Sequence, residues 1–538
     1  MHRCLLLDEI LEVIFDFVFN SMKLVDLRSA SNCHQIPYIL PSCYHHDRRS
    51  VFCLALTCHA FRDIAFGLLY SHLCSVRPLI KSLPHSELVF SGTASLVLTS
   101  EQFNSSIPYA ARVKFLFMQY DYHGTVYATL LASAPKDTLI FPNLRSLTWY
   151  DGRITSIPVL RLFLPTLETL SIDITETSFR QAIIPDLHIT APHLKALELM
   201  GNYVATQSEI KSLLLTYPEG LTKFSFQYCT ISSGLLDVIA TWPRLRWLTL
   251  QLGPESIPSV PFHAPQMFQA LTHLNISCNN LGIFTSFLRA FRMLRMDSDT
   301  YSLGCSNLKT IHINAKECNT SSTWSELLSS LTCTKLEHLI IEELCDWFSC
   351  TLAVFDFHPL LAHPIALAEL KTLVLIPNGY TSTITLTDTD IITLARTCPY
   401  LTVLDLGVRN TPISLYALNF LVRRCRELRR ASVCVNAELD ALGRTLLKND
   451  VDNDQGGLQP NMQLFQLHIG GKSPIACVGP LRPSTAPDLM MSIPRFLHMM
   501  APRLESIMKI LPEGKYGRRW EMVSDALSVM VKDSAKES

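Results

Sequence analysis

The sequence contains no long hydrophobic run, although 48% of its 538 residues are apolar. No stretch approaches the roughly 18 apolar residues that a membrane-spanning helix needs. Near the N-terminus, acidic residues follow only three consecutive leucines, a run too short for the apolar core of a signal peptide. We therefore expect no membrane partner, and we expect the protein in the cytoplasm, the nucleus or both.

Net charge is also nearly absent. Lys and Arg number 46 and Asp and Glu number 47, which gives a net charge of −1 and an isoelectric point near 7.0. The only dense basic run extends from Arg423 to Arg430. We interpret it as cations that offset the negative end of a helix dipole, and a nuclear-import or nucleic-acid patch is the alternative. The overall balance predicts no nucleic-acid partner.

Familiar signatures of enzymes and metal sites are missing too. The sequence has no G-x-S-x-G or H-E-x-x-H motif. Gly470 to Ser473 reads like the end of a phosphate-binding loop, but Gln466 stands where the first glycine belongs. Cysteines and histidines crowd the N-terminal region without the close pairs of a zinc site. These residues are Cys33, His34, Cys43, His45, His46 and Cys53. We predict a non-catalytic protein with no cofactor and no metal.

What the sequence does contain is a leucine-rich pattern, clearest from Leu271 to Leu281. The stretch Leu-Thr-His-Leu-Asn-Ile-Ser-Cys-Asn-Asn-Leu fits the L-x-x-L-x-L-x-x-N-x-L template of a leucine-rich repeat. Its alternation predicts a short strand with Leu274 and Ile276 in the core. We expect the Asn279 side chain to turn inward and to hydrogen-bond the backbone of neighbouring coils.

The pattern recurs about twelve times, with spacings from 23 to 37 residues. Short stretches of helical periodicity separate many of the copies. We therefore predict an α/β fold, a leucine-rich repeat solenoid with parallel strands on the concave face and helices on the convex face. The first leucines of the copies are Leu144, Leu167, Leu194, Leu221, Leu245, Leu271, Leu308, Leu336, Leu370, Leu401, Leu428 and Leu464.

Polar side chains of mixed charge occupy the outward positions of the predicted strands. Such a mixture suits a protein-binding face, although any exposed strand face is expected to be polar. We therefore predict that this face binds a target protein. The candidate residues are Tyr150, Asp173, Glu198, Gln227, Gln251, Asn275, His312, Asn314, Glu342 and Asp405.

The first 85 residues do not fit the repeat. Apolar residues recur at helical spacing from Leu5 to Val18, and a second helical pattern runs from Val51 to Leu83. The segment between them, at about 20–50, is polar and rich in turn-forming residues. We predict a small all-α module with an inserted loop.

The two halves of this module resemble an F-box. Met-His-Arg-Cys-Leu-Leu-Leu-Asp-Glu-Ile-Leu-Glu-Val-Ile-Phe, followed by Leu-Ala-Leu-Thr-Cys-His-Ala-Phe, is similar to the F-box of the F-box-like proteins of mushroom-forming fungi. Val76–Pro84 and Phe141–Trp149 also resemble that family, so the similarity covers most of the chain. The resemblance implies a substrate receptor of a Skp-cullin-F-box ubiquitin ligase.

By that resemblance, the apolar residues of the module bind a Skp-type adaptor and through it a cullin-RING ligase. A helix that docks in a groove needs such an apolar stripe. The alternative is that these side chains only pack against one another or against the first repeat. The candidate adaptor residues are Leu5, Leu7, Ile10, Leu11, Ile14, Phe15, Leu54, Cys58 and Phe61.

We expect four parts along the chain. Residues 1–85 form the F-box-like module, 86–140 a cap or degenerate first repeat, 141–512 the solenoid, and 513–538 a C-terminal cap and tail. The expected function is substrate recognition, with the concave face holding the target protein. The alternative function is a leucine-rich repeat interaction scaffold unconnected with ubiquitination.

Overall fold

The computed structural model of the chain divides into two compact units, Met1–Cys229 and Thr230–Ser538. The structure describes residues 8–20, 48–76, 78–79, 107–118, 139–150, 165–175, 181, 183–201, 207–217, 219–257, 268–292, 307–331, 335–344, 354–361, 367–377, 382–407, 409–437, 459–470, 473–475, 486–504, 506–509 and 517–537.

Three helices open the first unit: α1 (Asp8–Asn20), α2 (Arg48–Ala55) and α3 (His59–Ser71). Their shared core consists of Phe15, Phe19, Val51, Ala55, Ala65 and Leu69. The predicted loop at about 20–50 extends three residues too far, because Arg48–Ser50 already belong to α2. The rest of that segment, beyond Asn20, lies outside the described residues.

A parallel sheet follows α3 directly, and its strand order is the sequence order β1-β2-β3-β4-β5-β6. The short helices α9 (Leu187–Thr190) and α10 (Gln207–Leu215) belong to the return segments between strands. The strands are β1 (His72–Leu73), β2 (Phe115–Met118), β3 (Ser146–Trp149), β4 (Thr169–Asp173), β5 (Ala196–Met200) and β6 (Lys223–Thr230).

The second unit repeats this plan with parallel strands in the order β7-β8-β9-β10-β12-β14-β16-β18-β19. Two further parallel pairs, β11 (Val354–Asp356) with β13 (Thr383–Thr385) and β15 (Ile413–Ser414) with β17 (Val435–Asn436), lie in the return segments. The main strands are β7 (Trp247–Leu252), β8 (His273–Cys278), β9 (Thr310–Ala315), β10 (His338–Glu343), β12 (Thr372–Ile376), β14 (Val403–Asp405), β16 (Arg430–Val433), β18 (Gln466–Ile469) and β19 (Ser506–Lys509).

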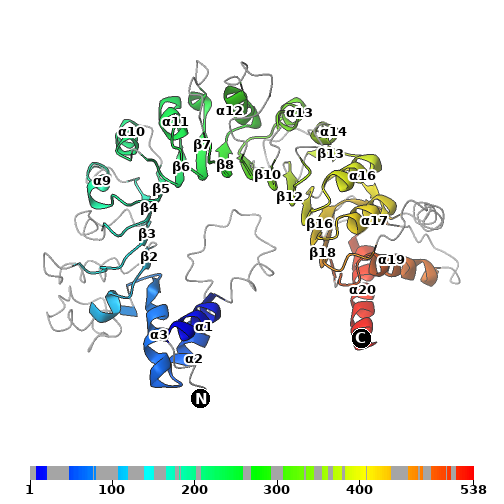
Figure 1. The fold of residues 1–538 in the computed structure, drawn as a ribbon. Helices are drawn as coiled ribbons and strands as arrows, with labels where there is room; N and C mark the ends of the chain where they lie inside the picture. Colours follow the sequence, from blue (N-terminus) through cyan, green and yellow to red (C-terminus); the bar gives the residue numbers. More distant parts are fainter. Residues whose placement is uncertain are drawn as a thin grey trace, which may run out of the picture. The chain divides into compact units, whose positions relative to one another are not determined.

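In the second unit the helices from α11 to α17 lie on one side of the coils and the main strands on the other (Figure 1). The last helix packs against β19, and the Ser524 hydroxyl accepts a hydrogen bond from Ile507 N at 3.0 Å. The helical segments are α11 (Ser233–Ala240), η8 (Pro254–Ser256), α12 (Leu281–Arg292), α13 (Ser321–Ser330), α14 (His358–Leu361), α16 (Asp388–Thr397), α17 (Leu415–Arg424), α19 (Ala486–Met500) and α20 (Gly517–Glu537).

The leucine pattern explains why the strands form. Along β8, for example, Leu274, Ile276 and Cys278 are buried, while the residues between them are half-buried on the other side. Because the strands pair in register, the buried positions stack as rows that run through each unit. This is the α/β, parallel, sequence-ordered arrangement expected of a solenoid.

The expected role of Asn279 was wrong. β8 continues to Cys278, so strand alternation buries Cys278 and leaves the Asn279 side chain exposed. Asn319, which is buried, does what we expected of Asn279. It accepts a hydrogen bond from Leu281 N at 2.7 Å in the preceding coil and donates to Glu343 Oε1 at 3.0 Å in the following one.

The predicted parts do not coincide with the two units. The first unit holds both the helices and the first strands, because the helices pack directly onto the start of the sheet through the contacts described below. In the C-terminal part, Trp520, Val523 and Leu527 of α20 are buried. Among the described residues, no helix has both the length and the apolar character needed to cross a membrane.

Asn461 is a second buried asparagine that connects coils. Its Nδ2 lies within 2.9–3.2 Å of three carbonyl oxygens, and its Oδ1 accepts from two backbone N–H groups at 2.6 and 2.9 Å. The carbonyls belong to Val422, Cys425 and Leu428, and the N–H groups to Gln463 and Leu464.

We predict that Asn461→Ala lowers the free energy of unfolding by about 2–4 kcal/mol, since it leaves several buried backbone groups without a partner. Thermal and chemical unfolding of the full chain measure the loss. Asn307→Ala is the matched control, because Asn307 is exposed and makes one side-chain bond, to Gln269 O at 3.0 Å. Equal losses in the two variants would contradict this role.

Candidate binding surfaces

Helix α1 carries apolar side chains on two faces. Leu11, Phe15 and Phe19 are each 1% exposed, and Phe15 packs edge-to-face on Phe61 of α3 at 5.2 Å between ring centroids. These residues recur at every fourth position and therefore share one helical face. They form the side of α1 that holds the three-helix module together.

The other face of α1 is apolar and exposed. Val13 is 70% and Phe17 72% exposed, and Ile10 and Ile14 are also exposed. Their spacing of three, four and seven residues places them side by side along the helix. Exposed apolar side chains in such a row mark a surface that a partner covers.

The adaptor residues expected from the sequence therefore divide into groups. Ile10 and Ile14 lie on the exposed face. Leu11 and Phe15 do not, because the module uses them as its own core. Leu5 and Leu7 lie outside the described residues.

The remaining expected residues come from the second half of the module. Leu54 and Phe61 are partly buried against the core, and Cys58 is half-buried at the start of α3. Four exposed apolar residues were not among the expected ones: Phe52 of α2, Leu56 just after α2, and Val13 and Phe17 of α1. For the α1 pair the missed signal was the helical spacing from Ile10.

The module joins the sheet without a linker, since α3 ends at Ser71 and β1 begins at His72. Lys114 N donates to Ser71 O at 2.9 Å, and the His72 ring stacks on Phe115 at 4.2 Å between centroids. Arg112 forms an ion pair with Asp63 of α3 at 3.6 Å.

Arg48 strengthens the same junction from α2. Its guanidinium donates to Leu69 O at 2.6 Å and to His72 O at 2.7 Å, at the end of α3. Burial lowers the pKa of Arg48, but an arginine stays charged at physiological pH. The three helices and the first strands are thus linked by backbone, ionic and aromatic contacts.

On the strand face of the first unit, the expected residues form a polar network. The Tyr150 hydroxyl is 3.0 Å from Ser171 Oγ, and Gln227 Nε2 donates to Glu198 Oε1 at 3.0 Å. Burial first, and Glu198 second, raises the pKa of Tyr150 to about 12, so the phenol is neutral at pH 7. Asp173 accepts a hydrogen bond from Thr175 N at 2.9 Å.

In the second unit, strand register brings several expected residues together. Asn275 lies opposite His312, and Asn314 lies opposite Glu342. His312 Nε2 is 3.8 Å from Glu342 Oε2. Gln251, at the end of the neighbouring β7, is half-buried on the same face.

Two of these candidates are not available to a target protein. Asn314 and Asp405 are both 4% exposed. The Asp405 carboxylate pairs with Arg430 at 3.0 Å and accepts from Gly407 N at 3.0 Å. Gly407 has φ +67°, a conformation that favours glycine. Asp405 therefore stabilises a turn and fixes an arginine, which is a structural role.

Trp247 is a surface residue that the sequence analysis did not select. It is 41% exposed and stacks on His273 of the next strand, with 4.3 Å between centroids and 7° between ring planes. Burial first, followed by His338 and Lys309, lowers the pKa of His273. The signal in the sequence was an aromatic residue near the start of a repeat, in Leu245-Arg246-Trp247-Leu248.

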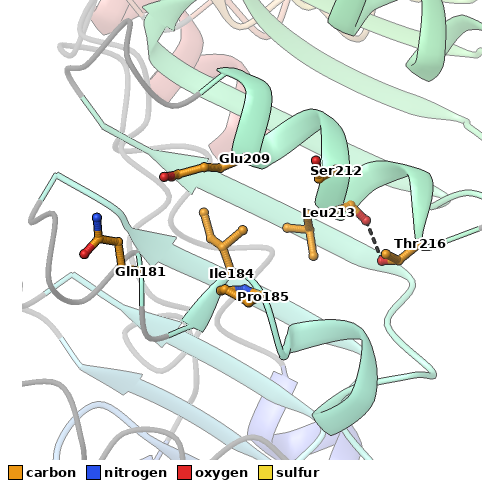
Figure 2. Close-up of a pocket in the computed structure, with 7 residues that line it drawn as sticks. All are labelled: Gln181, Ile184, Pro185, Glu209, Ser212, Leu213 and Thr216. Atoms are coloured by element: carbon orange, nitrogen blue, oxygen red, sulfur yellow. Dashed lines mark hydrogen bonds between the residues drawn. The ribbon is translucent and has the colours of Figure 1, made fainter.

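A cavity of about 300 Å³ opens on the helix side of the first unit (Figure 2). Ile184, Pro185 and Leu213 give it an apolar lining, with Glu209 at its margin. Thr216 at its end is hydrogen-bonded to Leu213 O at 2.6 Å. Gln181 and Ser212 complete the lining.

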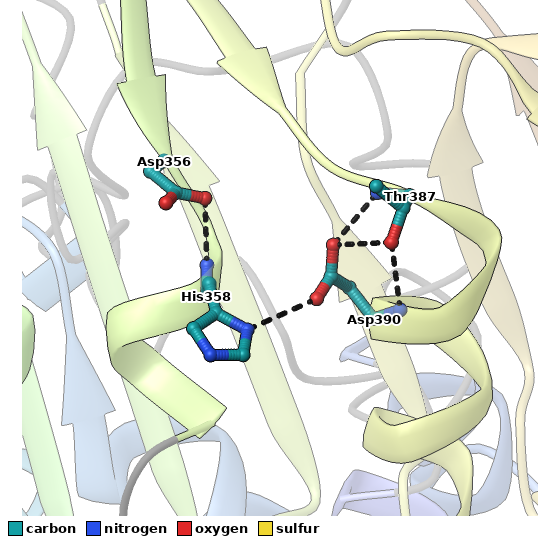
Figure 3. Close-up of polar contacts among 4 residues, drawn as sticks. All are labelled: Asp356, His358, Thr387 and Asp390. Carbon is teal, nitrogen blue, oxygen red and sulfur yellow. Dashed lines mark hydrogen bonds and ion pairs between the residues drawn. The ribbon is translucent and has the colours of Figure 1, made fainter.

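Asp356, His358, Thr387 and Asp390 form a polar cluster in the second unit (Figure 3). The Thr387 N–H and hydroxyl both donate to Asp390 Oδ2 at 2.7 Å, which is a capping box at the start of α16. His358 Nδ1 lies 3.4 Å from Asp390 Oδ1, but the His358 side chain is 74% exposed. The cluster is explained by helix capping.

The described cysteines are not grouped as ligands of a metal ion. Cys74 is disulfide-bonded. Cys278 and Cys398 are buried free thiols. Of the cysteines and histidines that crowd the N-terminal region, only Cys53 is described. Within the described residues, no three Asp, Glu, His or Cys side chains are grouped to hold a metal ion.

Comparison with known proteins adds little. No protein-family model and no curated protein matches the chain. The crystal structure of a TLR13–ssRNA13 complex is similar at a TM-score of 0.31 and 14% identity, over 62% of this chain and 46% of that chain. This chain thus spans less than half the length of the TLR13 chain.

A second structure, that of the Rad7 and Elc1 complex in yeast, has a TM-score of 0.29 and 14% identity, over 78% of this chain and 91% of that chain. Similarities of this size carry no argument about function. The functional argument therefore rests on the surfaces described above.

Glu337, just before β10, binds two lysines at once. Its carboxylate accepts from Lys309 and from Lys371, each at 2.6 Å. These two hydrogen bonds lower the pKa of Glu337 to about 2. A folded-state pKa below the usual value near 4.3 stabilises the fold above that value, and the contribution is lost as the pH falls towards 2.

We therefore predict that Glu337→Gln lowers the melting temperature at pH 7 by about 1–3 °C. The difference from the unmodified chain should shrink between about pH 5 and pH 3, because Glu337 of the unfolded chain takes up a proton in this range while the folded one stays ionised. Melting curves across this range check the prediction. Glu317→Gln, which removes an exposed carboxylate that forms no ion pair among the described residues, should show no such trend.

We predict that Asp390→Ala costs about 1–2 kcal/mol of stability, since it removes the capping partner of two Thr387 donors. His358→Ala should change stability by less than about 0.5 kcal/mol, because an exposed ion pair contributes little. Chemical unfolding of both variants measures the two losses in the free energy of unfolding. A larger loss for His358→Ala than for Asp390→Ala would show that the ion pair, and not the cap, is important.

Proposed function

We propose that this chain is a substrate-recognition subunit of a Skp-cullin-F-box ubiquitin ligase. The helical module binds a Skp-type adaptor, which connects the chain to a cullin-RING ligase. The strand face binds a target protein. The observation that carries the proposal is the exposed apolar face of α1, made of Ile10, Val13, Ile14 and Phe17.

That face is unusual for a helix that already has a core side. Leu11, Phe15 and Phe19 give α1 all the apolar surface it needs to pack on α3. Exposing a second apolar face to water raises the free energy by roughly 25 cal/mol for each Å² of apolar surface. Binding of a partner that covers the face is favourable by the same amount. The resemblance of the N-terminal module to an F-box supports a Skp-type adaptor as this partner.

The junction between α3 and β1 supports a receptor mechanism. A substrate receptor must hold its target at a defined distance from the ligase. Within the first unit, Arg48, Arg112 and Lys114 hold the helices against the first strands. Because these contacts join the helices to the first strands, the position of the helical module also fixes the position of those strands.

In this mechanism the chain supplies no catalytic residue. It raises the effective concentration of target lysines near the ubiquitin-charged enzyme, and proximity alone accelerates the transfer. We place this function in the cytoplasm, the nucleus or both. The second candidate is an interaction scaffold outside the ubiquitin system, and it is favoured by the polar strand face, which does not by itself require an adaptor.

We predict that changing Ile14 and Phe17 together to Asp abolishes co-purification of the full chain with a Skp-type adaptor, since it places two charges in an apolar interface. Leu215→Asp, which changes an exposed leucine of α10, should leave capture unchanged. Melting curves of both variants verify folding. If the unmodified chain captures no adaptor, or if both variants capture it equally, the scaffold function replaces this proposal.

A further inference from the structure

The residues directly before the main strands from β7 to β16 form one continuous row. We call Arg246, Thr272, Lys309, Glu337, Lys371, Thr402 and Arg429 the strand-start row. Each member after Arg246 donates its backbone N–H to the carbonyl oxygen of the previous member, at 2.7–2.9 Å. This unbroken chain of hydrogen bonds fixes the order and spacing of the seven residues.

Charge alternates along this row. Every second member, Arg246, Lys309, Lys371 and Arg429, is basic and exposed, whereas the members between them are half-buried. Thr272 and Thr402 turn their hydroxyls back to the preceding carbonyl, at 2.9 and 2.8 Å. The two threonine side chains are thus hydrogen-bonded to the backbone, and the four cations are the exposed members of the row.

The spacing of the four cations matches the side-chain repeat of an extended peptide. Adjacent strands lie about 4.8 Å apart, so every second member of the row repeats at about 10 Å. A peptide in the extended polyproline II conformation advances about 3.1 Å per residue with three residues per turn, so every third side chain points to the same side at a repeat of about 9 Å. A peptide that crosses the strands can thus place one carboxylate on each cation.

We propose that the strand-start row binds an acidic, extended segment of the target protein, with carboxylates about three residues apart. The inference rests on the proposed use of the strand face for target binding, but not on the identity of the adaptor. Trp247 and His273 begin their strands next to this row, so their stacked rings offer an apolar contact beside the acidic residues.

Glu337 shows how such a segment is held. Its carboxylate lies between Lys309 and Lys371 at 2.6 Å from each, so it occupies the position that a ligand carboxylate would take. Glu337 is therefore a competitor within the chain. Arg246 and Arg429 form no side-chain ion pair in the part of the chain that the structure describes, and they are free to bind first.

The surroundings favour a peptide over a nucleic acid. The four cations form a single file, with acidic groups at Glu337 within the row and at Glu342 on the adjoining strand face. A continuous phosphate backbone would meet these carboxylates and be repelled. A peptide with separated carboxylates can place its neutral residues opposite Glu337 and Glu342, so its own charges are not repelled there.

The test measures the affinity of the full chain for labelled peptides by fluorescence anisotropy. The probe is a peptide of about 13 residues with four glutamates three apart, which spans roughly 40 Å when extended. One control peptide has glutamine at the same positions, and another has the four glutamates in succession. A single-stranded oligouridylate is the nucleic-acid probe.

Three variants make the test specific. Changing Arg246 and Arg429 together to Gln should weaken binding of the spaced peptide roughly tenfold, by loss of two charge contacts. Glu337→Gln should strengthen it roughly threefold, because the lysines lose their internal partner. A merely structural role for Glu337 would not produce tighter binding. Lys316→Gln removes an exposed cation at the far end of β9 and should have no effect.

The proposal is supported if the spaced peptide binds best and the variants move its affinity in these opposite directions. It is overturned if the unmodified chain fails to bind the spaced peptide at about 1 mM, if the glutamine peptide binds equally, or if the row variants have no effect. Tighter binding of oligouridylate that depends on the same arginines would also overturn it. Adaptor capture, measured in parallel, separates the two proposals, since loss of capture with retained peptide binding contradicts only the proposed function.

Discussion

The parallel backbone hydrogen bonds between successive strand starts are the constraint on which the rest of each unit depends. In the second unit, one carbonyl accepts both the N–H of the next coil's strand-start residue and the N–H that follows it, as Thr272 O does from Lys309 and Thr310. This geometry leaves no freedom of register. The buried leucines then stack as rows, and the outward residues stack as rows beside them.

Because the register is fixed, residues that are far apart in the sequence lie side by side and form continuous surfaces. Lys309 and Lys371 are far apart in sequence, yet Glu337 contacts both. Trp247 and His273 stack because they begin neighbouring strands. The same regularity explains the polar network from Tyr150 to Gln227 in the first unit.

Buried polar groups connect one coil to the next. Asn319, Asn461 and Asp405 each satisfy backbone or side-chain groups that would otherwise be buried without a partner. Such a group cannot also bind a target protein. The strand face that remains for binding is therefore narrower than the set of polar outward positions, and its exposed charges lie largely at the strand starts.

The sequence by itself determined the periodic part of this protein. The leucine spacing predicted parallel strands with their core positions, since alternation within a strand is a local property of the backbone. It also predicted the apolar helices of the N-terminal module. It could not show which of two apolar faces of α1 is covered, because Leu11 and Ile14 are chemically alike and only the position of α3 separates them.

Tertiary structure decided the use of each polar residue. Asp405 and Glu342 occupy similar outward positions in sequence, yet Asp405 is buried by its pairing with Arg430 in the next coil and Glu342 is not. Asn279 fits the repeat template but is exposed, while Asn319 lies outside the template and is buried. The reason is that burial and charge pairing depend on neighbours about 25 to 40 residues away, whose positions only the stacking of coils determines.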